Sequence, residues 1–573
     1  MEEKQRMKEV CEMKQKNKIK QIAALLFLVL SLTVLPVITS AAVIPTADIL
    51  EVTGATVRYA DANGATTGDQ AQGLRFAVTV DKFSRTYLNA VKEEGYYTAD
   101  NATTKFGIVI IPTDLIPDGE ELSKDTPDAE VVIFDKIYAQ NDDEITFTAS
   151  LLGIPTEDYT RGFTARAFMK VTRSGEDRYS YSEEALSRTF VGVGNIFYEE
   201  NRENETLCAR VDEIFASCDA YQGVNLKSVT FTLFSDLHYW EGWYIATVGD
   251  LETILKRADQ SDSDFVIQAG DFTNHVGGSP ELFNAYLKNK YDLPAYGVYG
   301  NHELEGGDGM NTVTPKLTNR PDEVVWGTEN GKIAADGSIG YYYFDVNGIR
   351  MICLDTNYSF NPTTHEWEHS RKGSYSYPAG NQKGYSLGPT QLAWLEEVLN
   401  DAAENDTSCV VLSHHGFARS WYSSPDGDAV RALYKEANEK NPGTVLMSIN
   451  GHLHTNRTEV VDNVLHFDMN TVRNGVYTDN GTDHYTDQTF TFERYDANGK
   501  LISSASKPIK DLGHAKRSWF FKDPLSAVIT VSTSGKITIE GSKTEWLGGV
   551  APTNPGSGVM PEVTNGVFVL QVY

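Results

Sequence analysis

Five short polar clusters in the sequence combine residue types that can hold metal ions. Their Asp, His and Asn side chains offer the oxygen and nitrogen ligands that divalent metals such as Zn, Mn or Fe accept. Two such ions about 3.5–4 Å apart suit phosphoryl transfer, because they activate a water and neutralise charge on the phosphoryl oxygens. One such cluster alone is usually a turn or a buried histidine, whereas five in order favour a metal site. The clusters are Asp236-Leu237-His238, Gly270-Asp271, Gly300-Asn301-His302-Glu303, Ser413-His414-His415 and Gly451-His452-Leu453-His454.

Each cluster directly follows an apolar run that is typical of a buried strand. The first three clusters lie roughly 30 to 35 residues apart, which is the length of one strand–helix–strand unit. In α/β proteins, ligands bind at the carboxyl ends of the strands. We therefore expect all five clusters to converge in one crevice. The apolar runs are Val229–Phe234, Phe265–Ala269, Tyr296–Tyr299, Cys409–Leu412 and Val445–Ile449.

In this order, the five clusters resemble the full signature of the calcineurin-like metallophosphoesterases, over about residues 227–475. The resemblance implies a four-layer α/β/β/α sandwich around two divalent metal ions (Mn, Zn or Fe). It implies hydrolysis of phosphomonoesters or phosphodiesters by a hydroxide that bridges the two metals. The substrate is then a small phosphate ester.

The resemblance also implies a role for each residue. His302 matches the unliganded histidine that contacts the phosphate and helps to protonate the leaving group. Of the neighbouring His414 and His415, we favour His414 as the ligand because it comes first after the strand; His415 is the alternative. The implied metal ligands are Asp236, His238 and His454 for one ion, Asn301, His414 and His452 for the other, and Asp271 as the bridge between them.

One position departs from a branch of this superfamily. Purple acid phosphatases carry a tyrosine ligand three residues after the bridging aspartate, where this chain has Asn274. A purple ferric site is therefore not expected, and the identity of the metals stays open. Asn274 and His275 are candidates for hydrogen-bonding partners of the ligands.

The first 42 residues are typical of a secretory signal. Lysines at positions 14 to 20 precede the uncharged, mostly apolar run Ile22–Ile38, and small residues follow at Ser40, Ala41 and Ala42. This order of a positive, an apolar and a small-residue segment predicts cleavage near Val43. An uncleaved membrane anchor is the alternative, although the run is short for a bilayer and contains Pro36. We expect a secreted or cell-surface protein with no membrane span in the mature chain.

The rest of the chain divides into four segments. Residues 43–200 alternate apolar and polar side chains and predict a β-sandwich module; its layout weakly resembles modules of extracellular bacterial proteins. Such a module serves either as a spacer or for cell-surface or glycan contact. A polar connector at 201–226 leads to the metallophosphoesterase domain at 227–515. A small C-terminal β extension at 516–573 contains the hairpin Val528–Glu540.

Composition narrows the classes of function. The 573 residues are 40% hydrophobic, which suffices for large cores and excludes a mostly disordered protein. The net charge of −29 repels phosphate backbones, so no nucleic-acid binding is expected. Five cysteines are too few for a disulfide scaffold.

Three further features allow other interpretations. His365-Glu366-Trp367-Glu368-His369 fits the H-E-x-x-H pattern of zinc proteases, but that pattern needs a helix, and this stretch is expected to be a loop. Arg473 is expected either to bind a phosphate or to form a surface salt bridge. A surface-binding protein with a vestigial phosphoesterase domain is the alternative function, although all seven implied ligands are present. Candidates for substrate contact are the aromatic residues Tyr239, Trp240, Trp243, Trp367, Tyr375 and Tyr377.

Overall fold

The computed structural model describes most of the chain. The described residues are 50–58, 72–81, 102–117, 119–173, 175–239, 248–273, 286–304, 317–327, 340–361, 365–369, 385–419, 424–477, 489–495, 501–511, 518–547 and 567–571. The expected signal at 1–42 lies outside them, as do Trp240, Trp243, Asn274, His275, Tyr375 and Tyr377. Within the described residues, no helix is long and apolar enough to cross a membrane.

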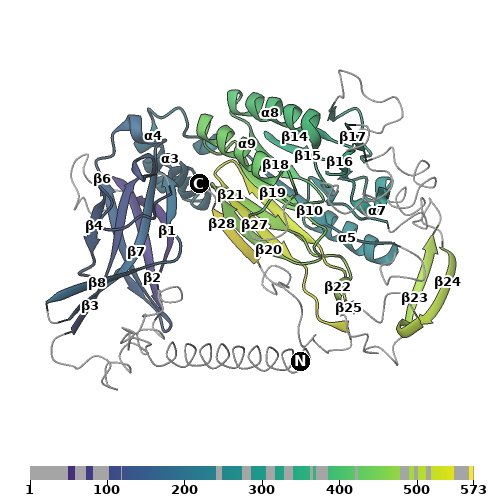
Figure 1. Cartoon of the computed structure of the whole chain (residues 1–573), viewed down its shortest axis with the longest axis horizontal. Coiled ribbons are helices and arrows are strands. Elements are labelled where there is room, and N and C mark those ends of the chain that lie inside the picture. Colours follow the sequence, from purple (N-terminus) through teal and green to yellow (C-terminus); the bar gives the residue numbers. More distant parts are fainter. Residues whose placement is uncertain are drawn as a thin grey trace, which may run out of the picture.

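The N-terminal region is β-rich, as its alternating sequence predicts (Figure 1). In β2, every second side chain from Leu74 to Val80 is fully buried, and these side chains pack against Ile108, Ile110 and Met169 of the other sheet. One sheet has the order β1 (Leu50–Arg58), β2 (Gly73–Asp81), β6 (Glu144–Leu152), β5 (Ala139–Gln140). The other has the order β4 (Glu130–Ile133), β3 (Ala102–Pro112), β7 (Gly162–Arg173), β8 (Glu176–Tyr181), with β9 (Leu186–Thr189) also on β7.

The expectation of strands and turns up to residue 200 is wrong for the last part of this region. Residues Phe190–Glu200 form helix α3, whose start is capped by the Thr189 hydroxyl accepting from Gly192 N. Residues Phe190 to Ile196 of this helix are all buried, packed against the sandwich and against α4 (Glu205–Phe215). Its two glycines gave it weak helical character in the sequence. Gly194 is required by packing, because a Cβ there would lie 2.3 Å from the Phe215 ring.

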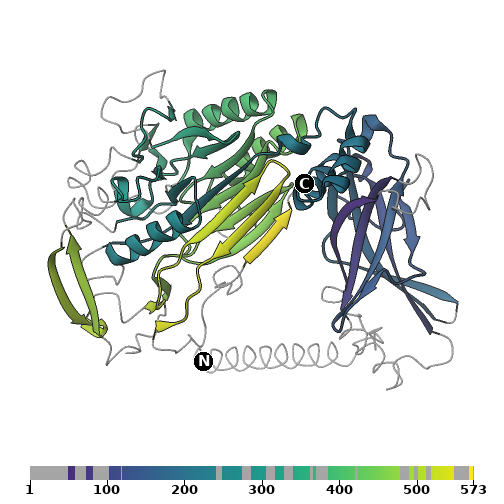
Figure 2. The same cartoon turned by 180° about the vertical axis from the view of Figure 1, so that it is seen from behind.

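Two mixed sheets make up the rest of the core (Figures 1 and 2). The six-stranded sheet has the order β12 (Ala295–Gly297), β11 (Phe265–Gln268), β10 (Ser228–Phe234), β26 (Ala527–Ser532), β27 (Lys536–Gly541), β28 (Val567–Gln571). The seven-stranded sheet has the order β13 (Val325–Trp326), β14 (Tyr342–Val346), β15 (Ile349–Cys353), β18 (Ser408–Leu412), β19 (Val445–Asn450), β21 (Val464–Asp468), β20 (Arg457–Val461). Three two-stranded pairs are β16 (Tyr358–Asn361) with β17 (Glu366–His369), β22 (Asn474–Tyr477) with β25 (Ser518–Phe520), and β23 (Thr489–Tyr495) with β24 (Leu501–Pro508).

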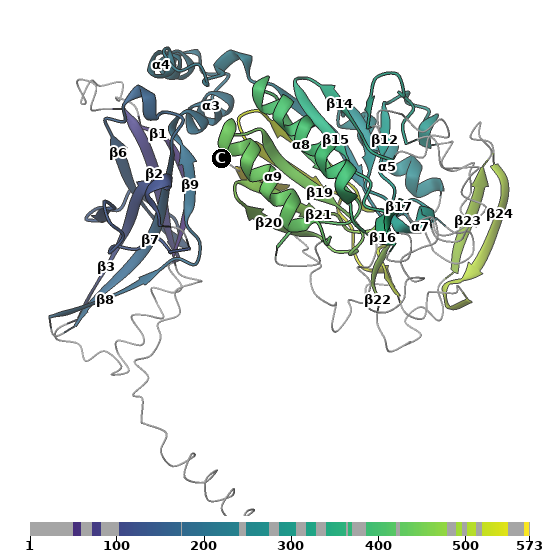
Figure 3. The ribbon, with the colours of Figure 1, turned by 45° about the horizontal axis from the view of Figure 1, so that its top comes forward.

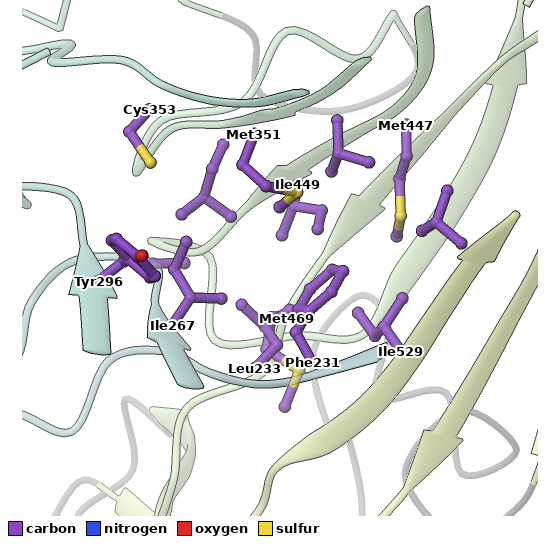
Figure 4. Packing of buried hydrophobic residues seen from close by; sticks show 14 of the residues in the cluster. Phe231, Leu233, Ile267, Tyr296, Met351, Cys353, Met447, Ile449, Met469 and Ile529 are labelled. Carbon is purple, nitrogen blue, oxygen red and sulfur yellow. The ribbon is translucent and has the colours of Figure 1, made fainter. Parts of the chain in front are cut away.

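The two large sheets share one hydrophobic core. Phe231 and Ile267 of the first sheet belong to the same buried cluster as Met351 and Ile449 of the second (Figure 4). Because their other faces also pack against helices, central strands such as β18 are apolar on both faces, which explains their continuous apolar runs.

Helices pack on the face of each sheet that lies away from the shared core (Figure 3). The helix α5 (Val248–Gln260) packs on the six-stranded sheet through Leu251, Ile254, Leu255 and Ala258, which share one helical face. On the seven-stranded sheet lie α8 (Gly388–Glu404) and α9 (Gly427–Lys440). The short α7 (Asn301–Leu304) follows β12.

The expected hairpin of the C-terminal tail is present as β26 and β27. Its strand β26 pairs antiparallel with β10 from Ser228 to Leu233. The turn of the hairpin also contacts the helices after the N-terminal sandwich: Ser534 Oγ donates to Glu199 Oε2 at 2.5 Å, and Lys536 Nζ lies 3.3 Å from Glu200 Oε1. This part of the tail therefore completes the sheet that carries the first three polar clusters.

Candidate metal centre

All five polar clusters lie at the carboxyl ends of strands, as expected. Asp236 and His238 follow β10, Asp271 follows β11, and Asn301 begins α7 just after β12. From the other large sheet, His414 follows β18, and the pair His452 and His454 follows β19. The site is therefore assembled from both sheets at one end of their shared core.

Four donor atoms form a first cluster around Asp236. His238 Nε2 lies 2.9 Å from His454 Nε2, and these two atoms are 3.5 and 3.2 Å from Asp236 Oδ1. Asp271 Oδ2 is 3.6 Å from His238 Nε2. Ligand atoms bound at about 2.1 Å to one ion lie about 3.0–3.4 Å apart in octahedral or tetrahedral geometry. The spacing of this cluster fits one metal ion at its centre.

A second cluster also adjoins Asp271. His414 Nε2 is 3.1 Å from Asp271 Oδ2, and the rings of His414 and His452 are 5.2 Å apart. The Asn301 side chain is buried at the same end of the sheets. Asp271 Oδ2 therefore faces histidines of both clusters, which is the position that a bridging oxygen requires.

Hydrogen bonds hold the remaining atoms of these side chains. His414 Nδ1 donates to the Ala269 carbonyl at 2.8 Å, which directs Nε2 toward Asp271. Asp236 Oδ2 accepts from the Ser235 hydroxyl and from His452 N, leaving Oδ1 for the histidines. Asp271 Oδ1 accepts from His302 N at 2.8 Å, leaving Oδ2. His415, the alternative to His414, has its Nδ1 2.6 Å from the Thr356 hydroxyl, and it also offers a ligand atom within 4.8 Å of those of His414 and His452.

The protonation states of the protein groups suit metal binding. Burial would raise the pKa of Asp236, but the charge of His454 and hydrogen bonds from His238 and His454 hold that pKa well below its usual value. Burial and the neighbouring His414 lower the pKa of His452 to about 3. Burial would also lower the pKa of His414, but the Asp271 carboxylate raises it to about 10. At neutral pH the Asp236 carboxylate is therefore ionised, and His414 carries a proton that a metal must displace.

The residues fit two divalent cations. Asp236 and Asp271 are fully buried, and within the described part of the chain their ion-pair partners are all histidines. Two buried carboxylates so close together need a compensating positive charge. Over the same residues, Asp236 Oδ1 and His414 Nε2 are buried without a hydrogen-bond partner, as free ligand atoms are. Oxygen and nitrogen donors of this kind accept Zn, Mn or Fe.

His302 lies at the edge of the cluster. Its Nε2 is 3.9 Å from Asp271 Oδ2, and its side chain is 24% exposed, whereas that of His454 is 12% exposed and that of His238 2%. Its ring meets the His238 ring edge to face at 4.7 Å. His302 therefore borders the metal centre while remaining open to a molecule from solvent.

Two side chains and one motif that were singled out in the sequence have other roles. Arg473 donates from Nε and Nη2 to Asp250 and from Nη1 to the Phe521 carbonyl, so it forms a salt bridge, although a largely buried one and not one at the surface. Tyr239 is buried, 4% exposed. Residues 366–369 form strand β17, so the H-E-x-x-H stretch is neither a loop throughout nor the helix that a zinc protease needs.

The role of Glu303 was missed in the sequence. Its carboxylate is buried and accepts hydrogen bonds from the backbone of both the Asp271 and the Asn301 loops. Burial, and then the nearby Asp271 charge, raise the pKa of Glu303 to about 7. The motif Gly300-Asn301-His302-Glu303 contained the residue, but its partners are backbone groups, which leave no mark in a sequence.

Comparison with known proteins identifies the class of this domain. Residues 229–456 match the family model described as calcineurin-like phosphoesterase. This part of the chain is therefore a calcineurin-like phosphoesterase domain, which makes the protein a phosphoric ester hydrolase. No curated protein matches the chain.

Solved structures with a similar fold are distant. One is a dimetal phosphatase from Danio rerio, 13% identical, covering 60% of this chain and 99% of that one, with a TM-score of 0.34. A putative 5'-nucleotidase from Staphylococcus aureus is 17% identical, covering 49% of this chain and 54% of that one, with a TM-score of 0.28. The phosphopantetheinyl hydrolase from Mycobacterium tuberculosis is 18% identical, covering 43% of this chain and 90% of that one, with a TM-score of 0.20.

Proposed function

We propose that the chain is an exported phosphoesterase that hydrolyses small phosphomonoesters or phosphodiesters with the aid of two divalent metals. The observation that carries this proposal is the position of Asp271 Oδ2, which lies 3.1 Å from His414 Nε2 and 3.6 Å from His238 Nε2. The proposed ligands of one metal are Asp236, His238 and His454, those of the other are Asn301, His414 and His452, and Asp271 joins both.

The protein groups have separate roles in this reaction. When bound, the metals would activate the attacking water and neutralise charge on the phosphoryl oxygens. The buried ligands keep water out of the centre except at its open edge. His302 is at that edge, where its imidazole would contact the phosphate and protonate the departing oxygen.

The fold of the catalytic domain is proposed to be the four-layer α/β/β/α sandwich expected from the sequence. The packing of α5 on one large sheet and of α8 and α9 on the other supports this. The proposed export rests on the sequence of residues 1–42. Sequencing the N-terminus of protein from the extracellular fraction is expected to give a start near Val43; a retained Met1 would favour the anchor.

The activity is tested with p-nitrophenyl phosphate and bis-p-nitrophenyl phosphate in parallel, each with Mn, Zn, Fe or Ni. The relative rates separate monoesterase from diesterase activity. We expect about two metals per chain by elemental analysis and loss of activity on chelation. Asp271→Asn should weaken both sites and remove nearly all activity. One bound metal with full activity in Asp271→Asn would contradict the bridging role.

A further inference from the structure

Glu303 connects two loops that carry proposed ligands. Its Oε2 accepts from Asp271 N at 3.0 Å and from Gly300 N at 2.6 Å, while its Oε1 accepts from Thr273 N at 3.0 Å. The side chain is buried, 4% exposed. One carboxylate therefore satisfies three backbone N–H groups, two from the loop after β11 and one from the loop after β12.

The loop after β11 and the loop after β12 lie so close together that a small displacement of one would change the direction of the Asp271 carboxylate. A Cβ at Gly300 would lie 2.1 Å from Asp271 Oδ1 and 2.4 Å from Asp271 N. His302 N donates to the same Oδ1 at 2.8 Å, which turns the other oxygen toward the histidines. The direction of the Asp271 carboxylate thus depends on the position of the Asn301–His302 backbone, and Glu303 sets that position.

We propose that Glu303 is a positioning residue, which fixes the Asp271 loop against the Asn301 loop so that Asp271 Oδ2 faces both metals. This inference rests on the proposed two-metal function. It assigns Glu303 no contact with metal or substrate. Groups that orient metal ligands in this way typically change metal affinity by 10–100-fold when they are replaced.

Glu303→Gln is the decisive variant. A glutamine has nearly the same shape, but its amide replaces one acceptor oxygen by an N–H₂ group, which must face at least one of the three backbone donors. The matched control is Asp264→Asn, the same chemical change on a carboxylate that accepts from Thr230 N at 2.9 Å. Asp264 precedes β11, at the opposite end of the strand from Asp271.

The readout is the affinity of the metal-free protein for Mn²⁺ and for Zn²⁺, measured by calorimetry, with melting temperatures measured alongside. We expect Glu303→Gln to bind at least tenfold more weakly, and excess metal to restore much of its rate on bis-p-nitrophenyl phosphate. Asp264→Asn should bind as the wild type does. Asp271→Asn should not be rescued by excess metal, since it lacks the bridging ligand.

A lower melting temperature of Glu303→Gln with unchanged metal affinity would show a merely structural role and would overturn the inference. If Glu303→Gln does not fold, Glu303→Asp takes its place: it keeps the charge but is one methylene too short to reach both loops, and the same loss of affinity is expected. A wild-type protein that binds no metal and hydrolyses neither ester would instead refute the proposed function itself.

Discussion

Five of the seven proposed ligands lie in the left-handed backbone region. The φ angles are 51° for Asp236, 47° for His238, 50° for Asp271, 71° for His452 and 55° for His454. Such conformations cost about 1–3 kcal/mol each for residues other than glycine and persist only where the surroundings enforce them. Spacing in the sequence was enough to select these residues, because their types are restricted by chemistry. Their conformations depend on hydrogen bonds between loops and could not be predicted.

At the scale of single residues, a substitution of His302 is expected to slow the chemical step while leaving metal binding unchanged. His302→Asn is expected to keep close to the wild-type metal content, because Asp271 and Asn301 remain. Its rate should fall by roughly 10²–10⁴, the usual contribution of a positioned general acid. The loss should be large for alkyl phosphates, whose alkoxide needs a proton, and much smaller for p-nitrophenyl esters. Steady-state rates on both substrate types, with metal analysis, check this.

Two results would argue against that role. Equal losses on alkyl and p-nitrophenyl esters would indicate that His302 positions the phosphate instead. A loss of bound metal would show that His302 is itself a ligand.

Among the elements, strands next to the site were easier to predict than their neighbours. Apolar runs buried on both faces, such as β11 and β18, stand out because polar residues end them abruptly. Helix α3 was not predicted, because Gly192 and Gly194 lower its helical propensity by about 1 kcal/mol each. What stabilises α3 is its contact with Phe215 on α4, and tertiary packing of this kind is not visible in a local sequence pattern.

Strand β21 contains a histidine that should make stability depend on pH. His466 is 0% exposed, and within the described residues neither of its ring nitrogens has a hydrogen-bond partner. Burial lowers its pKa to about 4, with a smaller opposing effect of Glu459. The unfolded chain takes up a proton near pH 6.5, but the folded chain does not until about pH 4, so stability is lost as the pH falls through this window.

The change that tests this is His466→Phe, which keeps a ring but removes the titration. Between pH 7 and pH 5 the wild type should lose on the order of 2 kcal/mol of unfolding free energy that the variant does not lose. Denaturant unfolding of the metal-free proteins at both pH values measures the difference. The exposed His365→Phe is the control and should behave as the wild type. An identical pH dependence in all three proteins would refute the assignment.

On the scale of the whole molecule, the C-terminal tail is expected to be essential for the catalytic core. Ile529, Val531, Ile537 and Ile539 of the hairpin are fully buried in the core shared by the two large sheets. A chain that ends at Leu525 would lose these side chains and expose the edge of β10. Burying each such side chain contributes about 1.5–3 kcal/mol, so the sum of about 6–12 kcal/mol is comparable to the usual net stability of a domain.

We therefore expect the chain ending at Leu525 to give no cooperatively melting, metal-binding protein. A chain that ends at Leu547 keeps β26 and β27 and should fold. Soluble yield, thermal melting and metal content of the two truncations check this. A shorter chain that melts like the wild type and binds two metals would contradict it.

The pairing of β10 with β26 also determines how late during synthesis this sheet can be completed. Thr230 and Thr530 are hydrogen-bonded although 300 residues separate them in the chain. At about 5–20 residues per second, a ribosome needs roughly 15–60 s to synthesise that interval. Throughout this interval, β10, the strand that Asp236 and His238 follow, has one edge uncovered. Maturation of the enzyme is thus a late event: the nascent chain must be kept from aggregating through that exposed edge, and the sheet next to the metal centre is complete only after β26 has been synthesised.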